Sequence, residues 1–436
     1  MPLLDFSQLP STNAFGVNVN LFYDWQGRSA YNHGLDSVAS LVWAAGIGWV
    51  RESFDWYLFE SDSSDRDTSK WNWTWPDSSY NLARHHGLNI LGILAYPPMS
   101  ESSDTITGDS LVNIQRSAPR DTAGWLNYVS AVVHHYPDVR YWEIWNEPNV
   151  GYFRVYNGLS QSEEYARLVR VAAGPIHSAG DYVVGGVIAY VTSSDSTDWK
   201  ILPSAFIDSV FGIWDVGDSI DVLSVHYYST DAWTDGLTTT LNDLNADVHA
   251  AQSTSPAYGQ IWVTEAGAGK PSDQADTVKN ALALSQFVRV YAAGGAPSFK
   301  KLFFWHAYAD SGPAPGGITR NYESGYPEST KAYREYAAYT KYAAAIEGPT
   351  KVKPNATCEW WTSVTGGVPA QASSPSYTYA WQPGSYTGED YDYTNGGASF
   401  TMVLTVTDSN GVPAVASLPV TVASNAMTCP YRPTGK

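Results

Sequence analysis

Residues 122–146 read TAGWLNYVSAVVHHYPDVRYWEIWN and contain a predicted helix followed by a predicted strand. The apolar side chains of Thr122–His135 recur every three or four positions, which is typical of an amphipathic helix. Those of Val139–Asn146 form a nearly continuous apolar run, which indicates a parallel strand buried on both faces. This stretch is therefore one unit of an alternating α/β fold.

The same alternation extends in both directions, from about residue 15 to residue 310. Further apolar strands are predicted at Phe15–Leu21, Ile47–Phe54, Asn89–Tyr96, Tyr182–Ile188, Ser219–Tyr228, Gln260–Glu265 and Lys300–Trp305. Further helices are predicted at Gly34–Ala45, Glu163–Ala179, Ala275–Ala293 and Ser329–Ile346. Eight strands that alternate with helices indicate a (β/α)8 barrel. A doubly wound sheet is the alternative, but no glycine-rich phosphate loop follows the first strand.

The pattern changes after Gly348-Pro349, which looks like a linker. Short alternating segments separated by Gly, Pro, Asp and Asn predict strands at Ser376–Trp381, Ser399–Thr407 and Ala414–Val422. The segment Phe400–Gly411 resembles the late hairpin of polycystic-kidney-disease-type and related Ig-like modules. We therefore expect two domains, a (β/α)8 TIM barrel in residues 1–347 and a small all-β Ig-like sandwich in residues 348–436.

The only two cysteines, Cys358 and Cys429, both lie in the predicted sandwich. They indicate one disulfide bond in a secreted, extracellular protein, with two reduced buried thiols as the alternative. Neither cysteine has a Cys or His at the spacing of zinc ligands, so no metal site is predicted. Met1–Asp5 lacks the features of a signal peptide, so a secreted protein would be a mature or trimmed form.

The composition excludes several classes of partner. The formal net charge is −18, from 25 basic and 43 acidic residues, which disfavours nucleic acid and anionic membrane surfaces. No apolar run reaches the roughly 18 residues of a membrane span. The 18 Trp and 30 Tyr suit carbohydrate binding, because the apolar faces of sugar rings stack on aromatic rings. Nothing in the sequence indicates an oligomeric state.

Two glutamates end predicted strands four and seven. Glu147 lies in Trp145-Asn146-Glu147-Pro148, and Glu265 lies in Thr264-Glu265-Ala266-Gly267. The carboxyl ends of barrel strands carry the active site. Hydrolysis of a glycoside needs one carboxylic acid that protonates the leaving oxygen and one carboxylate on the other side of the bond. The pair therefore predicts a glycosidase site, with structural ion pairs at the barrel rim as the alternative.

Both motifs resemble those of glycoside hydrolase clan A. The segment Ile144–Asn149 is most similar to family 39, with family 5 close behind. The resemblance covers about residues 15 to 345. It implies a retaining mechanism on a β-linked glycan, with Glu147 as acid/base and Glu265 as nucleophile. Such a double displacement needs no metal or organic cofactor.

The resemblance also implies substrate-binding and supporting roles for other positions. Asn146 matches the clan residue that hydrogen-bonds the sugar 2-hydroxyl, and Arg51 matches the arginine that orients the nucleophile and keeps it ionised. His226 and Tyr228 match the clan's His-x-Tyr pair, in which the tyrosine contacts the nucleophile.

Two further positions complete the predicted site. Trp305 matches the tryptophan that floors the subsite of the cleaved sugar. Tyr96 stands where several relatives place a histidine, and this departure leaves the exact family and the sugar open. Two alternatives to a hydrolase remain, a transglycosylase of the same chemistry and a non-catalytic carbohydrate-binding barrel. The presence of both carboxylates favours an enzyme.

Overall fold

A computed structural model describes most of the chain. The described ranges are 15–18, 47–60, 66–104, 116–192, 200–229, 233–268, 298–304, 319–320, 328–329, 343–365, 377–388, 390–408 and 413–426, with isolated positions among 39–43 and 283–296. The chain divides into two compact units, Met1–Tyr333 and Arg334–Lys436.

The first unit is a closed barrel of eight strands in sequence order. They are β1 (Phe15–Asn18), β2 (Trp49–Ser53), β3 (Asn89–Leu94), β4 (Tyr141–Ile144), β5 (Tyr182–Ala189), β6 (Val222–Ser229), β7 (Ile261–Ala268) and β8 (Phe299–Phe304). Every neighbouring pair is parallel, including the closing pair of β1 and β8. The predicted (β/α)8 barrel is confirmed, and each of its eight strands lies where the apolar runs placed it.

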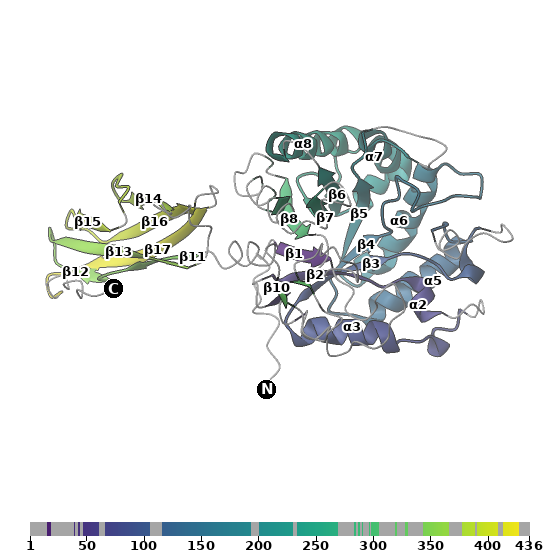
Figure 1. The fold of residues 1–436 in the computed structure, drawn as a ribbon, viewed down its shortest axis with the longest axis horizontal. Coiled ribbons are helices and arrows are strands. Elements are labelled where there is room, and N and C mark those ends of the chain that lie inside the picture. The colour runs from purple at the N-terminus through teal and green to yellow at the C-terminus, as the bar shows by residue number, and fades with distance from the viewer. Residues whose placement is uncertain are drawn as a thin grey trace. The chain divides into compact units, whose positions relative to one another are not determined.

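Helices surround these strands on the outside (Figure 1). They are α2 (Trp56–Phe59), α3 (Thr74–His85), α5 (Thr122–His135), α6 (Gln161–Ser178), α7 (Pro203–Gly212) and α8 (Trp233–Ala251). Helix α5 has the predicted bounds, and α6 begins and ends within two residues of the prediction. The predicted helices at 34–45 and 275–293 lie mostly outside the described residues. None of the described helices is both long and apolar enough to cross a membrane.

The ends of α5 and α6 follow from their sequences. The carboxylate of Asp121 accepts a hydrogen bond from the Gly124 amide at the start of α5. Ser160 and Glu163 form a reciprocal capping box at the start of α6. Both caps satisfy backbone amides that have no partner within the helix. They fix the helices that follow β3 and β4, and therefore the loops that lead to the site.

The interior of the barrel begins with an apolar floor near the amino-terminal ends of the strands. It consists of Trp49, Leu91, Val184, Val222, Trp262 and Phe303, with Tyr141 packed against them. Gly16 on β1 faces the Phe303 ring, and a Cβ atom there would lie 2.3 Å from a ring carbon, so only glycine fits. This floor closes one end of the barrel and leaves the carboxyl ends of the strands for polar groups.

The described part of the second unit contains two small sheets. One has the strand order β11 (Ala343–Glu347), β13 (Thr357–Thr365), β15 (Tyr391–Thr394). The other has the order β12 (Lys351–Val352), β17 (Pro413–Val422), β16 (Phe400–Asp408), β14 (Tyr377–Gln382). Their shared core includes Trp360, Trp381, Met402, Leu404 and Val406. The all-β character of this region is confirmed, as are the three predicted strands.

The helix predicted at Ser329–Ile346 is contradicted at its described ends. Ser329 lies in β10 (Glu328–Ser329), and Ala343–Glu347 forms β11, while residues 330–342 lie outside the described ranges. Strand β11 pairs antiparallel with β13, from Ala343 opposite Thr365 to Glu347 opposite Trp361. Pairing with a neighbouring strand therefore overrides the helix propensity of alanine. For the same reason the second unit includes residues before the predicted boundary at 347/348.

Cys358 is buried in the core of the second unit. Cys429 lies outside the described residues. The disulfide between them stays a prediction.

Candidate active site

A polar layer lies above the apolar floor of the barrel. Its members are buried and follow the floor positions by two residues along β1, β2, β4, β6 and β7: Asn18, Arg51, Glu143, Ser224 and Thr264. Alternate residues of a strand face the same side, so this spacing directs both layers into the barrel. The layer forms a continuous hydrogen-bond network, which supports the groups at the strand ends.

Arg51 is the centre of this network. Its Nε donates to Glu143 Oε2 at 2.5 Å, and its Nη1 donates to Glu265 Oε1 at 2.7 Å and to Asn18 Oδ1 at 2.9 Å. Its Nη2 donates to Asn146 Oδ1 at 2.9 Å. Burial lowers the pKa of Arg51, but the carboxylates of Glu143 and Glu265 outweigh it and raise that pKa above its ordinary value. Arg51 is therefore a fixed cation that bridges two acids.

Glu265, in the carboxyl-terminal half of β7, has a hydrogen-bond donor on each carboxylate oxygen. Oε1 accepts from Arg51, and Oε2 accepts from the Tyr228 hydroxyl at 2.9 Å. His226 Nδ1 lies 3.5 Å from Oε2. Burial raises the pKa of Glu265 above its ordinary value, although His226, Arg51 and the Tyr228 hydrogen bond lower it. Glu265 is therefore a buried carboxylate whose orientation is fixed by a donor on each oxygen.

Tyr228 remains a hydrogen-bond donor at neutral pH. Burial, and then the nearby carboxylates of Glu265 and Glu147, raise its pKa well above the ordinary value. Its hydroxyl therefore keeps the proton that it donates to Glu265.

Glu147 lies in the loop after β4 and is more accessible than Glu265, with 16% of its side chain exposed against 8%. Its φ of 48° and that of Trp145, 67°, both lie in the left-handed region, which costs a non-glycine residue free energy. The loop is anchored by the buried indole of Trp145, which donates to the Tyr152 carbonyl at 2.8 Å. Asn149 also holds the loop, through hydrogen bonds to both backbone groups of Ala189.

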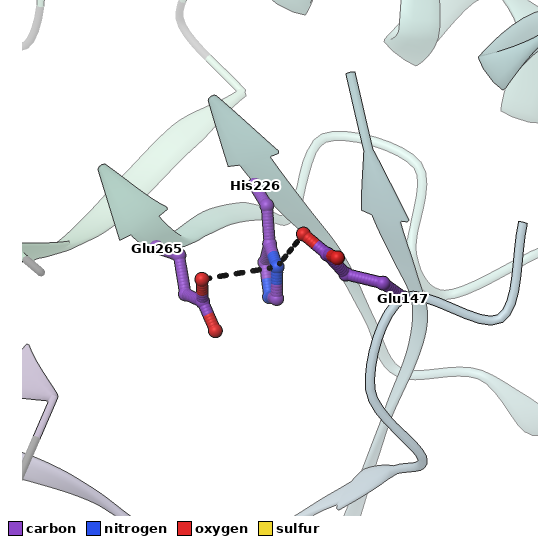
Figure 2. A group of neighbouring side chains, drawn as sticks. All are labelled: Glu147, His226 and Glu265. Carbon is purple, nitrogen blue, oxygen red and sulfur yellow. Dashed lines mark hydrogen bonds and ion pairs between the residues drawn. The ribbon is translucent and has the colours of Figure 1, made fainter. Parts of the chain in front are cut away.

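His226 connects the two glutamates. Its Nδ1 lies 3.0 Å from Glu147 Oε1 and 3.5 Å from Glu265 Oε2. Figure 2 shows the imidazole between the two carboxylates, with β6 and β7 supplying His226 and Glu265. Nδ1 donates the hydrogen bond to Glu147 when Glu147 is ionised, and it can accept one when Glu147 is protonated.

Of the two remaining predicted site residues, the structure describes Tyr96 but not Trp305. Tyr96 follows β3, and its ring lies 5.5 Å from that of Trp145. Because Trp145 directly precedes Asn146 and Glu147, Tyr96 lies at the same rim as these two residues. Trp305 lies outside the described residues, so its role stays a prediction.

Sequence reasoning missed four members of the polar layer, Asn18, Glu143, Ser224 and Thr264. Glu143 carried the clearest signal, because it is a charged residue inside an apolar strand predicted to be buried on both faces. Its partner could not be read from the sequence, since Arg51 is brought to it only by closure of the barrel.

Glu147, His226 and Glu265 also have a geometry that could hold a cation. Each offers one ligand atom, and these atoms lie within 4.8 Å of one another. One feature disfavours this use of the site: Arg51 and Tyr228 already occupy the two oxygens of Glu265.

Asp55, just after β2, has a strongly unfavourable environment. It is buried, and among the described residues its Oδ1 has no hydrogen-bond partner. Burial raises its pKa to about 7, although Tyr57 and Arg51 lower it. Its folded pKa exceeds the unfolded one, so the cost of its charge is absent below about pH 4 and grows as the pH rises through 7.

We therefore expect Asp55→Asn to be more stable than the wild type at pH 8, by roughly 2–4 kcal/mol. At pH 4 the two proteins should unfold at the same denaturant concentration, because the wild-type side chain is then protonated in the folded state. Urea unfolding of both proteins at the two pH values measures this. A variant that is less stable at pH 8, or equally shifted at both pH values, would contradict the assignment.

An eight-stranded barrel with two neighbouring glutamates, one in the loop after β4 and one in the carboxyl-terminal half of β7, has the architecture of a glycosidase. Residues 46–292 match the family model described as a glycosyl hydrolase catalytic core. This match spans more than half of the chain, so the protein belongs to that family and is a glycosidase with a carbohydrate substrate. The finer resemblance to family 39 is not confirmed, because this family model does not distinguish it.

Three solved structures are similar to the chain. The tri-modular endo-β-1,4-glucanase B of Bacillus halodurans is 11% identical, with a TM-score of 0.51 over 94% of this chain and 78% of that one. An endo-β-1,4-glucanase of Bacillus licheniformis is 13% identical, with a TM-score of 0.46 over 94% and 78%. An exo-β-1,4-mannosidase of Opitutaceae bacterium strain TAV5 is 15% identical, with a TM-score of 0.46 over 78% and 62%. At these identities the likeness concerns the fold alone. No curated protein matches the chain in sequence.

Proposed function

We propose that the protein is a retaining glycosidase for a β-linked glycan, with Glu265 as nucleophile and Glu147 as acid/base. The observation that supports this most strongly is the approach of the two carboxylates, whose oxygens lie within 4.8 Å of each other beside His226. Retaining pairs are about 5–5.5 Å apart, whereas inverting pairs leave about 6.5–9.5 Å for a water molecule. The short separation favours retention.

In the first step Glu265 attacks the anomeric carbon, and the bond from that carbon to the leaving oxygen breaks. Glu147 gives its proton to that oxygen, so the leaving group departs as a neutral alcohol. Arg51 and Tyr228 hold the two oxygens of Glu265 and orient the carboxylate for this attack. In the second step Glu147 removes a proton from water, the water attacks the same carbon, and Glu265 leaves as a carboxylate.

Asn146 is placed for a supporting role. Its Oδ1 accepts from Arg51, which directs the opposite, donating end of the amide away from the arginine. An amide donor beside the nucleophile suits a sugar 2-hydroxyl, whose hydrogen bonds strengthen in the transition state.

The stereochemistry of the first product tests the proposal. A panel of β-linked glycans and aryl β-glycosides should include β-1,4-glucan and β-1,4-mannan, the classes named for the similar solved structures. Proton NMR of the reducing sugar during the first minutes should show the β-anomer, followed by slow mutarotation. An initial α-anomer would mean inversion. Saturable binding without hydrolysis of any glycan would instead favour a carbohydrate-binding barrel.

We also propose that the protein works outside the cell and that its second unit is an accessory domain. The single pair of cysteines and the low share of charged residues, 16%, support the location. Deletion of the second unit separates two roles for it: loss of affinity for insoluble glycan would mean binding, and loss of thermal stability alone would mean bracing. The truncated protein should end before Ala343, so that β11 is removed together with its partner strand β13.

A further inference from the structure

The polar layer contains a third carboxylate that the catalytic steps do not use. Glu143 on β4 has an exposed fraction of 0%, so it cannot meet a substrate from solvent. A buried carboxylate is costly unless it is paired, and its retention inside a barrel needs a physical reason. Its partners supply that reason.

Glu143 accepts a hydrogen bond on each of its carboxylate oxygens, one from Ser224 and one from Arg51. Its Oε1 accepts from Ser224 Oγ at 2.7 Å, and its Oε2 accepts from Arg51 Nε at 2.5 Å. Ser224 Oγ lies 2.5 Å from Thr264 Oγ1, and since the Ser224 hydrogen points to Glu143, Thr264 is the donor in that pair. The carboxylate is therefore fixed before it meets the guanidinium.

The edge of Arg51 that meets Glu143 determines where its other nitrogens point. With Nε on Glu143, Nη1 reaches Glu265 and Nη2 reaches Asn146. A guanidinium is a planar, rigid fork, so a shift at Nε moves both other contacts. Arg51 also divides one positive charge between two carboxylates, Glu143 at 2.5 Å and Glu265 at 2.7 Å.

We propose that Glu143 is a positioning residue: it fixes Arg51 against the nucleophile and, by sharing the positive charge of Arg51, sets the pH at which Glu265 becomes reactive. This inference rests on the proposed function of Glu265. It predicts that removal of the Glu143 charge leaves Glu265 with a stronger share of Arg51, so that Glu265 ionises at lower pH and is a weaker nucleophile.

The other titratable groups near this pair are not altered by such a substitution. Around Glu265 they are His226 and Tyr228 on β6 and Glu147 after β4. Around Glu143 and Arg51 they are Tyr165 on α6 and Asp55 after β2. On β8, Lys301 lies at the floor, with its ammonium 4.4 Å from the centre of the Trp49 ring. A shift caused by Glu143 can therefore be read against a constant background.

Two variants distinguish the effect of the negative charge of Glu143 from the effect of its side-chain length. Glu143→Gln keeps an oxygen for Arg51 but loses the charge, and it should move the acid limb of kcat/KM down by about one pH unit and lower the plateau kcat about tenfold. Glu143→Asp keeps the charge but withdraws by one carbon, and it should lower kcat on the order of 100-fold with a smaller movement of the acid limb. In both variants KM for an aryl β-glycoside should stay within about twofold, because Glu143 does not touch substrate.

Glu101→Gln is the matched control. Glu101 is also fully buried, and its ion pairs join it to Arg66 at 2.5 Å and Arg120 at 3.3 Å instead of to Arg51. This variant should lose thermal stability while it keeps the wild-type kcat and acid limb. If Glu143→Gln behaved like this control, or kept wild-type rate and acid limb, Glu143 would be a structural ion-pair partner and the inference would be overturned.

Different results would contradict the catalytic role of Glu265 and the positioning role of Glu143. An inactive wild type, or an active Glu265→Ala, would contradict the proposed function itself. An active wild type with an inactive Glu265→Ala, but with an unmoved acid limb in Glu143→Gln, would overturn the role of Glu143 alone.

Discussion

Glu265→Ala is expected to lower kcat on every substrate by about 10⁵-fold or more. Without the carboxylate no covalent intermediate forms, and neither Tyr228 nor Asn146 can replace it as a nucleophile at neutral pH. The loss should be the same for polysaccharides and for aryl glycosides with good leaving groups, because the attack on the anomeric carbon is common to both. Initial rates of the purified variant on both kinds of substrate measure this.

Glu265→Gln is the control for folding. It keeps the shape of the side chain and should be equally inactive. Burial raises the pKa of Glu265, so its negative charge costs stability at pH values above that raised pKa. The glutamine variant should therefore melt at the wild-type temperature or higher at pH 7. Residual activity above the expected level in both variants would mean that another group attacks the sugar.

Glu147→Ala is expected to separate substrates by their leaving groups. On polysaccharides and unactivated oligosaccharides kcat should fall by about 10²–10⁴-fold, since the leaving oxygen receives no proton. On a dinitrophenyl β-glycoside the first step needs no acid and should remain fast, so that the glycosyl-enzyme accumulates and a burst of dinitrophenol precedes slow turnover.

Addition of azide tests whether Glu147→Ala lacks only its general base or has a more widely damaged active site. A small anion needs no general base, so it should attack the accumulated intermediate of Glu147→Ala, restore turnover and release a β-glycosyl azide. The wild type should not respond, because its water attack is already assisted. Equal losses on all substrates, or no effect of azide, would contradict the acid/base role of Glu147.

Much of the barrel was predictable because its strands are buried on both faces and are therefore almost purely apolar. The segments that became β3 and β5 illustrate this, and the predicted ends placed Glu147 and Glu265 at one rim. The strands of the second unit were harder to predict from the sequence. Ala343–Glu347 has a helix-favouring composition, and only its pairing with β13 makes it a strand.

The candidate site likewise contains residues that could be predicted from the sequence and residues that could not. The residues at the strand ends could be predicted because their types and spacing carry the chemistry of glycoside hydrolysis. The groups beneath them could not, because their roles depend on contacts across the barrel. Asn18 and Ser224, for example, are ordinary polar residues in the sequence, and only closure of the barrel brings them to Arg51 and Glu143. The left-handed backbone of Glu147 likewise has no signature in the sequence.

The most direct test of the central claim is to trap the intermediate on Glu265. The wild type would be incubated with the 2-deoxy-2-fluoro derivative of the activated aryl glycoside that it hydrolyses, because the fluorine slows the second step more than the first. The intact protein should gain the mass of one fluorosugar, and peptide sequencing by mass spectrometry should place that mass on Glu265. A fluorosugar on any other residue, or turnover of the normal substrate with inversion and no trapped species, would contradict the account.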